Sequence, residues 1–239
     1  MFSGAQADPG YWAVVPAAGA GTRMGAERPK QYLTLGERTV LEHTLEALLA
    51  CDVLSGIVVV VAEQDTYWPA IAPRYRDRPL VSVSGGAERC HSVQNGLHRL
   101  AGLAGPHDRV LVHDAARPCL RADDVNRLIK TVGDDENGGL LGVPVADTMK
   151  RVNGALRVAG TVERNGLWHA LTPQLFRIDL LDAALAAAID AGVALTDEAS
   201  AMEHAGHAPR MVQGSRDNIK ITLPADLGLA SYYLHARRT

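Results

Sequence analysis

The chain has 239 residues, of which 47% are hydrophobic and 21% are charged, the composition of an ordinary globular protein. α/β folds of this length often form one unit, so we expect a single domain over residues 1–239 that needs no disulfide or structural metal to fold. Lysine and arginine number 24 against 27 aspartate and glutamate, a formal net charge of -3. Because nucleic-acid and anionic-membrane binders usually carry a basic excess, we expect neither nucleic acid nor a membrane as a partner.

The sequence shows no recognisable targeting signal, and this together with its cysteine usage predicts a cytoplasmic protein. The longest apolar run, Ile57 to Ala62, falls well short of the roughly 20 residues that cross a bilayer, and the first ten residues lack the basic start of a secretory signal. The three cysteines, Cys51, Cys90 and Cys119, lie far apart in sequence, and an odd count suits a reducing compartment.

Short β-branched runs alternate with helical periodicities, the pattern of an α/β fold with helices flanking a mostly parallel sheet. Strands are predicted at Tyr11 to Pro16, Ile57 to Ala62, Leu80 to Ser84, Arg109 to His113 and Leu140 to Val145. Helices are predicted from Thr39, from Asp123 to Val132, from Asp179 to Ala191, from Thr196 to Ala205 and from Pro224. The first of these has a capping box, because Glu42 follows Thr39 by three residues.

Residues 146–165 do not fit the βαβ pattern. Two short runs, Thr148 to Val152 and Ala155 to Val158, flank Asn153-Gly154, a pair typical of a type I′ hairpin turn. A two-stranded ribbon is only marginally stable alone, so this β-arm should lie against the body or against another subunit. The second option predicts a homodimer.

The first strand leads into a run of small residues from Pro16 to Gly25. Backbone N–H groups of such a run can cradle phosphate oxygens, and Arg23 and Lys30 bring positive charge to the same loop. The glycine spacing matches neither a dinucleotide fingerprint nor a P-loop, and the alternative is a glycine-rich turn with solvated cations. The two cations favour a polyphosphate clamp.

Asp114 follows the fourth predicted strand. Ligands of open α/β sheets bind beyond the carboxyl ends of strands, so Asp114 is well placed for Mg²⁺ and Arg117 for a second anion. The alternative is a loop-capping aspartate paired with Arg117. His113 alternates with Asp114 and is expected to point the other way, in a structural role.

Two further clusters contain candidate binding residues. Lys220 and Asp217 lie in a polar stretch before the last helix; Asp217 is a second candidate for the metal site, and a surface ion pair is the commoner fate of a lone lysine. Gly85 and Gly86 could form a turn against a flat base or ribose, with Ser92 as a hydrogen-bond donor. The alternative there is a plain strand-to-helix turn.

The sequence has no G-x-S-x-G elbow, H-E-x-x-H motif or Cys/His zinc spacing. The chemistry should therefore need neither a protein nucleophile nor a strong base. Nucleotidyl transfer onto a phosphate monoester fits, because an acceptor with a second pKa near ~6 is largely dianionic at pH 7. Such a reaction needs charge neutralisation and alignment.

Eight ordered segments between about Trp12 and Tyr233 resemble the 2-C-methyl-D-erythritol 4-phosphate cytidylyltransferase family. They begin at Pro16, Pro29, Val112, Asp147, Arg164, Leu171, Thr196 and Asp217. The resemblance implies a Rossmann-like nucleotidyltransferase fold with a projecting β-arm, and a homodimer whose arm reaches the partner's site. It also implies transfer of CMP from CTP to 2-C-methyl-D-erythritol 4-phosphate with Mg²⁺, which releases pyrophosphate.

The same resemblance assigns roles to the candidate residues. Arg23 and Lys30 match the cations that stabilise the transition state; Arg164 and Lys220 match those that position the acceptor phosphate, with Arg164 acting across the dimer. The residues implied to line the acceptor pocket are Thr148, Arg117 and Thr172. Those implied to form the wall for cytidine and triphosphate are Ala17, Ala18, Gly19, Ala20, Gly21, Gly85, Gly86 and Ser92, and Asp114 matches the acid near the metal.

The sequence leaves the effect of Ala87 and three alternative functions open. Ala87 stands where relatives often carry aspartate, so CTP binding is expected to be looser if that side chain contacts ribose and unchanged if only its backbone does. Ribitol 5-phosphate cytidylyltransferase shares the glycine loop and the Asp114 and Lys220 regions, but Arg164 with Leu167-Trp168 favours the methylerythritol enzyme. The glycine spacing argues against an NAD-dependent oxidoreductase, and the two lysines argue against a non-catalytic nucleotide sensor.

Overall fold

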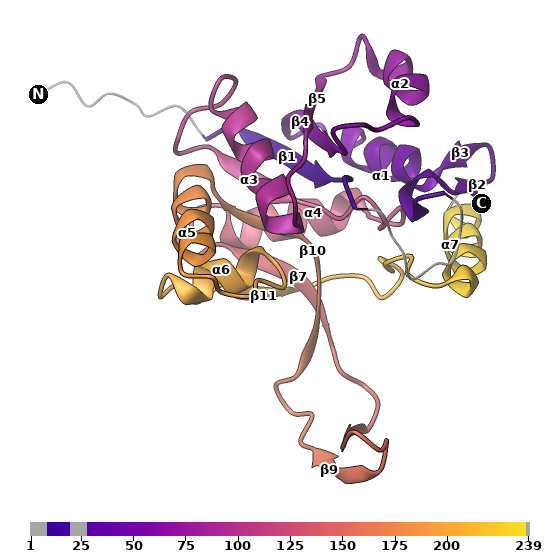
Figure 1. Ribbon diagram of the computed structural model, residues 1–239, viewed down its shortest axis with the longest axis vertical. Helices are drawn as coiled ribbons and strands as arrows, with labels where there is room; N and C mark the ends of the chain where they lie inside the picture. The colour runs from indigo at the N-terminus through magenta and orange to yellow at the C-terminus, as the bar shows by residue number, and fades with distance from the viewer. Residues whose placement is uncertain (1–8, 20–27, 238–239) are drawn as a thin grey trace, which may run out of the picture.

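Seven strands form a central sheet in the order β11-β7-β10-β6-β1-β4-β5 (Figure 1). The structure, a computed structural model, describes residues 9–19 and 28–237. The strands are β1 (Tyr11–Pro16), β4 (Leu54–Val61), β5 (Leu80–Ser84), β6 (Arg109–Val112), β7 (Gly139–Pro144), β10 (Trp168–Arg177) and β11 (Arg210–Gln213). Neighbours pair in parallel except β10, which runs antiparallel to β6 and β7. The predicted mostly parallel sheet is confirmed.

Helices cover both faces of the sheet. One face packs on α1 (Val40–Leu49) and α4 (Ala122–Val132), and the other on α3 (Arg89–Leu100), α5 (Ile178–Asp190) and α6 (Glu198–His204). The remaining elements are η2 (Lys30–Tyr32), β2 (Thr34–Leu35), β3 (Arg38–Thr39), α2 (Trp68–Ile71), η3 (Ala72–Tyr75) and α7 (Pro224–Ala236). Over the described ranges, no helix has both the length and the apolarity needed to cross a membrane.

Local sequence signals account for the best-predicted elements. The capping box of α1 is present, because the Thr39 N–H donates to Glu42 Oε2 at 2.8 Å and the Glu42 N–H donates to Thr39 Oγ1 at 3.2 Å. In β4, Val58 and Val60 face one core cluster while Val59 faces the other. A parallel strand covered on both faces reads as a continuous apolar run, which is why β4 was evident in the sequence.

β10 and β11 were not predicted. β10 contains Pro173 and the polar Gln174, and its pairing with β7 is irregular between Ala170 and Gln174, so it gives no clean alternation. β11 has only four residues. Both strands exist because tertiary pairing with β7 supplies the hydrogen bonds that local pattern does not indicate.

The β-arm consists of β8 (Met149–Val152) and β9 (Val158–Val162) and projects away from the sheet (Figure 1). The predicted two-residue turn is wrong. The Asn153 N–H donates to the Arg157 carbonyl at 3.0 Å, which encloses a three-residue loop that ends on Leu156 at φ +58°. Asn153 Oδ1 accepts hydrogen bonds from the backbone N–H groups of Ala155 and Arg157, so this side chain organises the longer loop.

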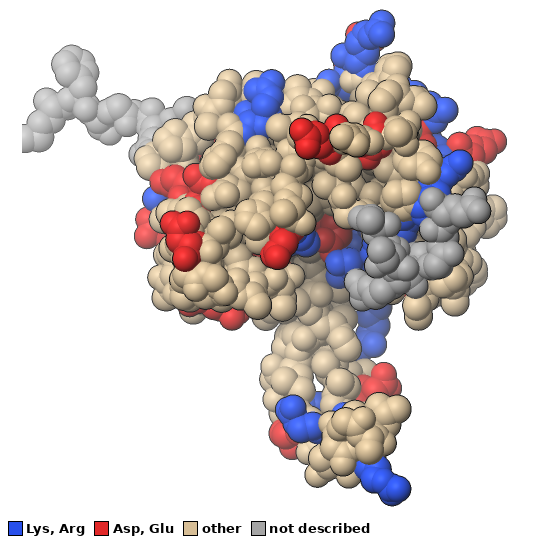
Figure 2. All heavy atoms as spheres, in the orientation of Figure 1, with Lys and Arg blue, Asp and Glu red and all other residues tan. Residues whose placement is uncertain are grey.

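Apolar side chains of the arm are exposed. Val152, Leu156 and Val158 keep 48%, 83% and 64% of their accessible surface. Figure 2 shows basic and acidic side chains together on the far part of the arm. A two-stranded ribbon with an exposed apolar surface is only marginally stable by itself. This supports the expectation that the arm packs against another protein surface, such as a second subunit.

Candidate active site

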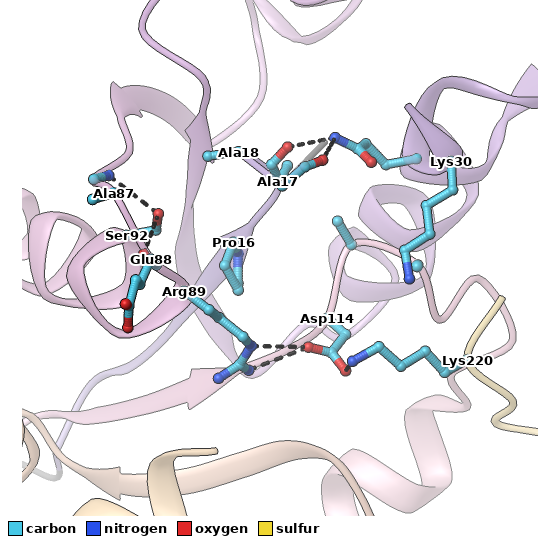
Figure 3. Close-up of a pocket in the computed structure, with 15 residues that line it drawn as sticks. Pro16, Ala17, Ala18, Lys30, Ala87, Glu88, Arg89, Ser92, Asp114 and Lys220 are labelled. Carbon is cyan, nitrogen blue, oxygen red and sulfur yellow. Dashed lines mark hydrogen bonds and ion pairs between the residues drawn. The ribbon is translucent and has the colours of Figure 1, made fainter. Parts of the chain in front are cut away.

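The glycine-rich segment and Asp114 meet at the carboxyl ends of the parallel strands. From β1 the chain moves outward to β4 and β5, then returns to β6 on the other side of β1. Such a reversal opens a crevice at the strand ends. A pocket of about 290 Å³ lies there (Figure 3). It is lined by Pro16, Ala17, Ala18, Gly19, Lys30, Gln31, Gly86, Ala87, Glu88, Arg89, Ser92, Asp114, Ala115, Ala116 and Lys220.

One wall of the pocket joins the end of β1 to the turn after β5. A Cβ atom on Gly85 would lie 2.6 Å from Ala18 Cβ and 2.8 Å from Ser92 Oγ, so glycine allows this close approach. The Gly86 N–H donates to Ser92 Oγ at 3.2 Å. The described residues predicted for this wall are therefore adjacent in space, whereas Ala20 and Gly21 lie outside the described residues, as does the predicted catalytic cation Arg23.

Gln31 was missed by the sequence analysis. Its side chain is buried, and Nε2 donates to the carbonyls of Ala17 at 2.6 Å and Gly19 at 3.0 Å. Gln31 thereby ties the small-residue loop to η2. The same short helix carries Lys30, whose side chain extends over the pocket toward the side where Asp114 and Lys220 meet (Figure 3).

Asp114 is surrounded by three cations. Its carboxylate lies 2.9 Å from Lys220 Nζ, 3.2 Å from Arg89 Nη2 and 3.3 Å from Arg117 Nε. Burial alone would raise the pKa of Asp114, but the three cations outweigh burial and hold that pKa well below its usual range. Asp114 is therefore a fixed anion at neutral pH, and it holds Lys220 at the pocket surface.

Arg117 lies behind Asp114 and is not among the residues that line this pocket, so its expected contact with a second anion stays a prediction. Its side chain is buried, and Nη1 donates to the Asn218 carbonyl at 2.8 Å. Burial lowers its pKa, against the opposing effect of Asp114. The pairing of Asp114 with Arg117, the alternative interpretation of this loop, is present.

His113 and Thr172 fix the backbone that carries Asp114. His113 Nε2 lies 3.1 Å from the Arg117 carbonyl and must donate to it, so Nδ1 accepts from the Thr172 hydroxyl, also at 3.1 Å. Thr172 Oγ1 in turn accepts the Asp114 N–H at 3.0 Å. Burial lowers the pKa of His113 to about 4, so this chain of bonds contains a neutral imidazole at pH 7. The structural role predicted for His113 is confirmed.

The His113 imidazole should make stability depend on pH. Its pKa is about 4 in the folded chain against 6.5 when exposed, so the unfolded chain takes up a proton first as the pH falls. Stability is thereby lost between about pH 6.5 and pH 4, by about 1–2 kcal/mol at pH 5. We expect His113→Asn to lose less stability from pH 7 to pH 5 than the unmodified protein in urea unfolding. Exposed His98→Asn is the control, and equal losses for all three proteins would contradict this.

An ion pair between pocket-lining Arg89 and buried Glu198 was also missed. Glu198, at the start of α6, is 1% exposed and accepts two hydrogen bonds from Arg89, at 2.5 and 3.1 Å. Burial opposes the charged form of Arg89, but Glu198 and Asp114 outweigh it and raise the pKa of Arg89. Glu198 thus positions the Arg89 guanidinium, which in turn pairs with Asp114. Its segment was part of the family resemblance, but no local signal linked it to Arg89.

Asp217 is not among the residues that line this pocket, so its expected role as a metal ligand stays a prediction that its ion pairs do not favour. Its carboxylate pairs with Arg121 and lies 2.8 Å from Arg237 Nη2. These arginines come from the start of α4 and the end of α7. They balance the charge of Asp217 outside the pocket that contains Asp114.

Thr148 and Arg164 lie on the β-arm and are exposed. Arg164 Nη1 donates to the Ala146 carbonyl, and neither residue lines the pocket of its own chain. Within one copy, the structure therefore does not bring them together with Lys30 and Lys220.

The pocket as a whole suits a polyphosphate. Small residues expose the backbone of one wall, and Lys30, Arg89 and Lys220 supply positive charge against the two carboxylates of the lining, Asp114 and Glu88. Such an arrangement neutralises and orients phosphoryl groups without a protein nucleophile.

Comparisons with known proteins agree with this geometry. The family model described as 2-C-methyl-D-erythritol 4-phosphate cytidylyltransferase matches residues 11–236. A protein of that name from Hahella chejuensis is 50% identical over 234 residues, covering 98% of this chain and 97% of its own. Another from Pseudomonas aeruginosa is 53% identical over 223 residues, covering 92% and 94%.

Solved structures show the same fold. A crystal structure of 4-diphosphocytidyl-2C-methyl-D-erythritol synthase superposes with a TM-score of 0.83 at 39% identity, covering 95% of this chain and 99% of that chain. The 2-C-methyl-D-erythritol 4-phosphate cytidylyltransferase of Francisella tularensis gives a TM-score of 0.79 at 33% identity, covering 94% and 99%.

Proposed function

Since the chain belongs to the 2-C-methyl-D-erythritol 4-phosphate cytidylyltransferase family, we propose that the pocket around Asp114 is its active site. The enzyme transfers CMP from CTP to 2-C-methyl-D-erythritol 4-phosphate in isoprenoid precursor biosynthesis. The products are 4-diphosphocytidyl-2-C-methyl-D-erythritol and pyrophosphate. The observation that carries the placement is that Lys30, Lys220 and Asp114 line one pocket beside the small-residue loop, with Lys220 Nζ 2.9 Å from the Asp114 carboxylate.

In the proposed mechanism an acceptor phosphate oxygen attacks the α-phosphorus of CTP. A new P–O bond forms as the bond from the α-phosphorus to the bridging oxygen breaks. Pyrophosphate leaves on the side opposite the attacking oxygen and takes the electron pair of the broken bond. No base is required, because the acceptor is already a dianion. Lys30 stabilises the charge that grows on the α-phosphoryl and bridging oxygens, and the loop from Ala17 to Gly19 cradles the triphosphate.

Lys220 is proposed to position the acceptor phosphate. In the structure its Nζ is held by Asp114 at 2.9 Å, at the surface of the pocket. That contact pre-orients the ammonium group so that an incoming phosphate finds it already aimed into the pocket. Thr172 helps to position Asp114, because the Thr172 hydroxyl accepts a hydrogen bond from the Asp114 backbone N–H.

Mg²⁺ is part of the proposal, with Asp114 as its protein ligand. Mg²⁺ is usually held by one or two carboxylates together with substrate phosphates, and Asp114 is an ionised carboxylate that lines the same pocket as the small-residue loop. The metal would neutralise triphosphate charge. The chain's own contribution is to fix Asp114 through Arg89, Arg117 and Thr172.

A homodimer in the cytoplasm completes the proposal. The exposed apolar surface of the β-arm supports dimerisation, and Arg164 and Thr148 would then reach the pocket of the partner subunit. The cytoplasmic location rests on Cys51, Cys90 and Cys119, which are free thiols.

Glu198 should act on catalysis through Arg89 and Asp114. We expect Glu198→Gln to lower the free energy of unfolding by about 1–3 kcal/mol, because the half-buried Arg89 guanidinium loses one of its two anionic partners. Arg89 would then pair with Asp114 alone and compete more strongly with Mg²⁺ for that carboxylate. Half-maximal activity should therefore require a higher Mg²⁺ concentration. Glu203→Gln, at an exposed position of the same helix, is the control. A lowered kcat with unchanged Mg²⁺ dependence would limit Glu198 to a role in the fold.

Pyrophosphate release tests the function. Purified protein with Mg²⁺ and CTP receives 2-C-methyl-D-erythritol 4-phosphate, ribitol 5-phosphate or no acceptor in parallel reactions. Release only with the methylerythritol substrate is expected. Release only with ribitol 5-phosphate would keep the chemistry and change the acceptor, and no release with either would contradict cytidylyl transfer.

A further inference from the structure

A separate set of metal-ligand side chains lies at the start of α3. Glu88, Cys90 and His91 each offer one ligand atom, and these atoms all lie within 4.8 Å of one another. Cys90 Sγ is 3.9 Å from Glu88 Oε2 and 3.9 Å from His91 Nδ1. All three residues are exposed or half-buried, so a cation and water have access to them.

The donor types select a borderline or soft cation. Thiolate and imidazole are preferred ligands of Zn²⁺, whereas Mg²⁺ prefers oxygen. Bond lengths near 2.3 Å to sulfur and 2.0–2.1 Å to nitrogen separate tetrahedral ligands by roughly 3.5 Å. The distances of 3.9 Å in the structure therefore need only small side-chain movements to close on an ion.

The local backbone holds these ligands together. Glu88 is the N-cap of α3, so Cys90 and His91 fall in its first turn, where anionic groups are favoured. Gly86 packs on His91, because a Cβ atom at Gly86 would lie 2.4 Å from His91 Cβ. Figure 3 shows the Glu88 carboxylate directed away from Asp114, although Glu88 also lines the pocket around Asp114.

We propose that Glu88, Cys90 and His91 form a site for a thiophilic divalent cation such as Zn²⁺, with water completing the coordination. The ion displaces the Cys90 thiol proton to solvent when it binds, and no oxidation or reduction is involved. The proposal stands on the geometry of these three side chains, of which Glu88 also lines the pocket around Asp114.

Alkylation of Cys90 provides a direct test. Cys51 and Cys119 are buried, and burial raises the pKa of each thiol to about 11, so iodoacetamide at pH 7.5 should modify Cys90 selectively. We expect Zn²⁺ to protect Cys90 at micromolar concentration in the full-length protein, as measured by mass spectrometry of the Cys90 peptide. Mg²⁺ at millimolar concentration should give no protection.

Substitutions then identify the other ligands. Glu88→Gln and His91→Asn should each raise the Zn²⁺ concentration for half-protection by at least ~10-fold. His98→Asn is the matched control, because His98 lies on the same helix and pairs with Asp182. Thermal melting checks that each variant is folded. Absence of protection in the unmodified protein, or unchanged protection in both ligand variants, would overturn the site.

Discussion

Lys30→Ala is expected to slow turnover by at least ~10²-fold while the protein still folds, since this is the scale of losing one transition-state charge contact. Lys30 extends from η2 over the pocket, on the side where Asp114 and Lys220 meet (Figure 3). Its charge matters most when negative charge builds on the α-phosphoryl oxygens. The loss should therefore fall mainly on kcat, measured by pyrophosphate release at saturating CTP and acceptor.

The controls for Lys30 separate charge from folding. Lys130→Ala removes an exposed lysine of α4 and should leave turnover unchanged. Lys30→Arg keeps the charge but changes its shape and hydration, so an intermediate rate is expected. Near-normal turnover of Lys30→Ala, with normal thermal melting, would remove Lys30 from the mechanism.

Mixing two inactive variants should restore activity if the arm acts across a dimer. Arg164→Ala changes the arm and Lys30→Ala changes the body, and each homodimer should be nearly inactive. A mixed dimer has one site in which both residues are altered and one in which both are intact. After subunits exchange, half of the dimers are mixed, so about a quarter of the normal activity should return.

A mixture of Lys30→Ala with Lys220→Ala is the matched control. Both changes lie on the body, so every site in a mixed dimer carries one of them and no activity should return. Rescue by Arg164→Ala but not by Lys220→Ala would support the shared site. Activity of an Arg164→Ala monomer, or the absence of rescue in dimers shown to exchange, would contradict it.

The parts of the fold predicted well are those with strong local signals. β1 and β5 have the bounds that their apolar runs indicate, and the Thr39 cap fixes the start of α1. β10 escaped prediction because its pairing with β6 and β7, rather than its own pattern, makes it a strand. The arm turn differed because the Asn153 side chain stabilises a longer loop than the Asn-Gly pair suggests.

The site was predictable where its residues are close in sequence to a strand end. Ala17, Ala18 and Asp114 follow this rule, and they line one pocket with Lys30, which was found from its charge beside the small-residue run. The support behind them depends on distant segments. Arg89 meets Glu198 across 109 residues of sequence, and no spacing rule indicates such a contact.

Direct competition between acceptors tests the central claim most directly. The enzyme, Mg²⁺ and CTP are incubated with equal concentrations of 2-C-methyl-D-erythritol 4-phosphate and ribitol 5-phosphate, and both products are quantified by mass in one sample. The ratio of products reports the ratio of kcat/KM values. We expect the methylerythritol product to exceed the ribitol product by at least ~10²-fold. An equal yield, or an excess of the ribitol product, would contradict the account.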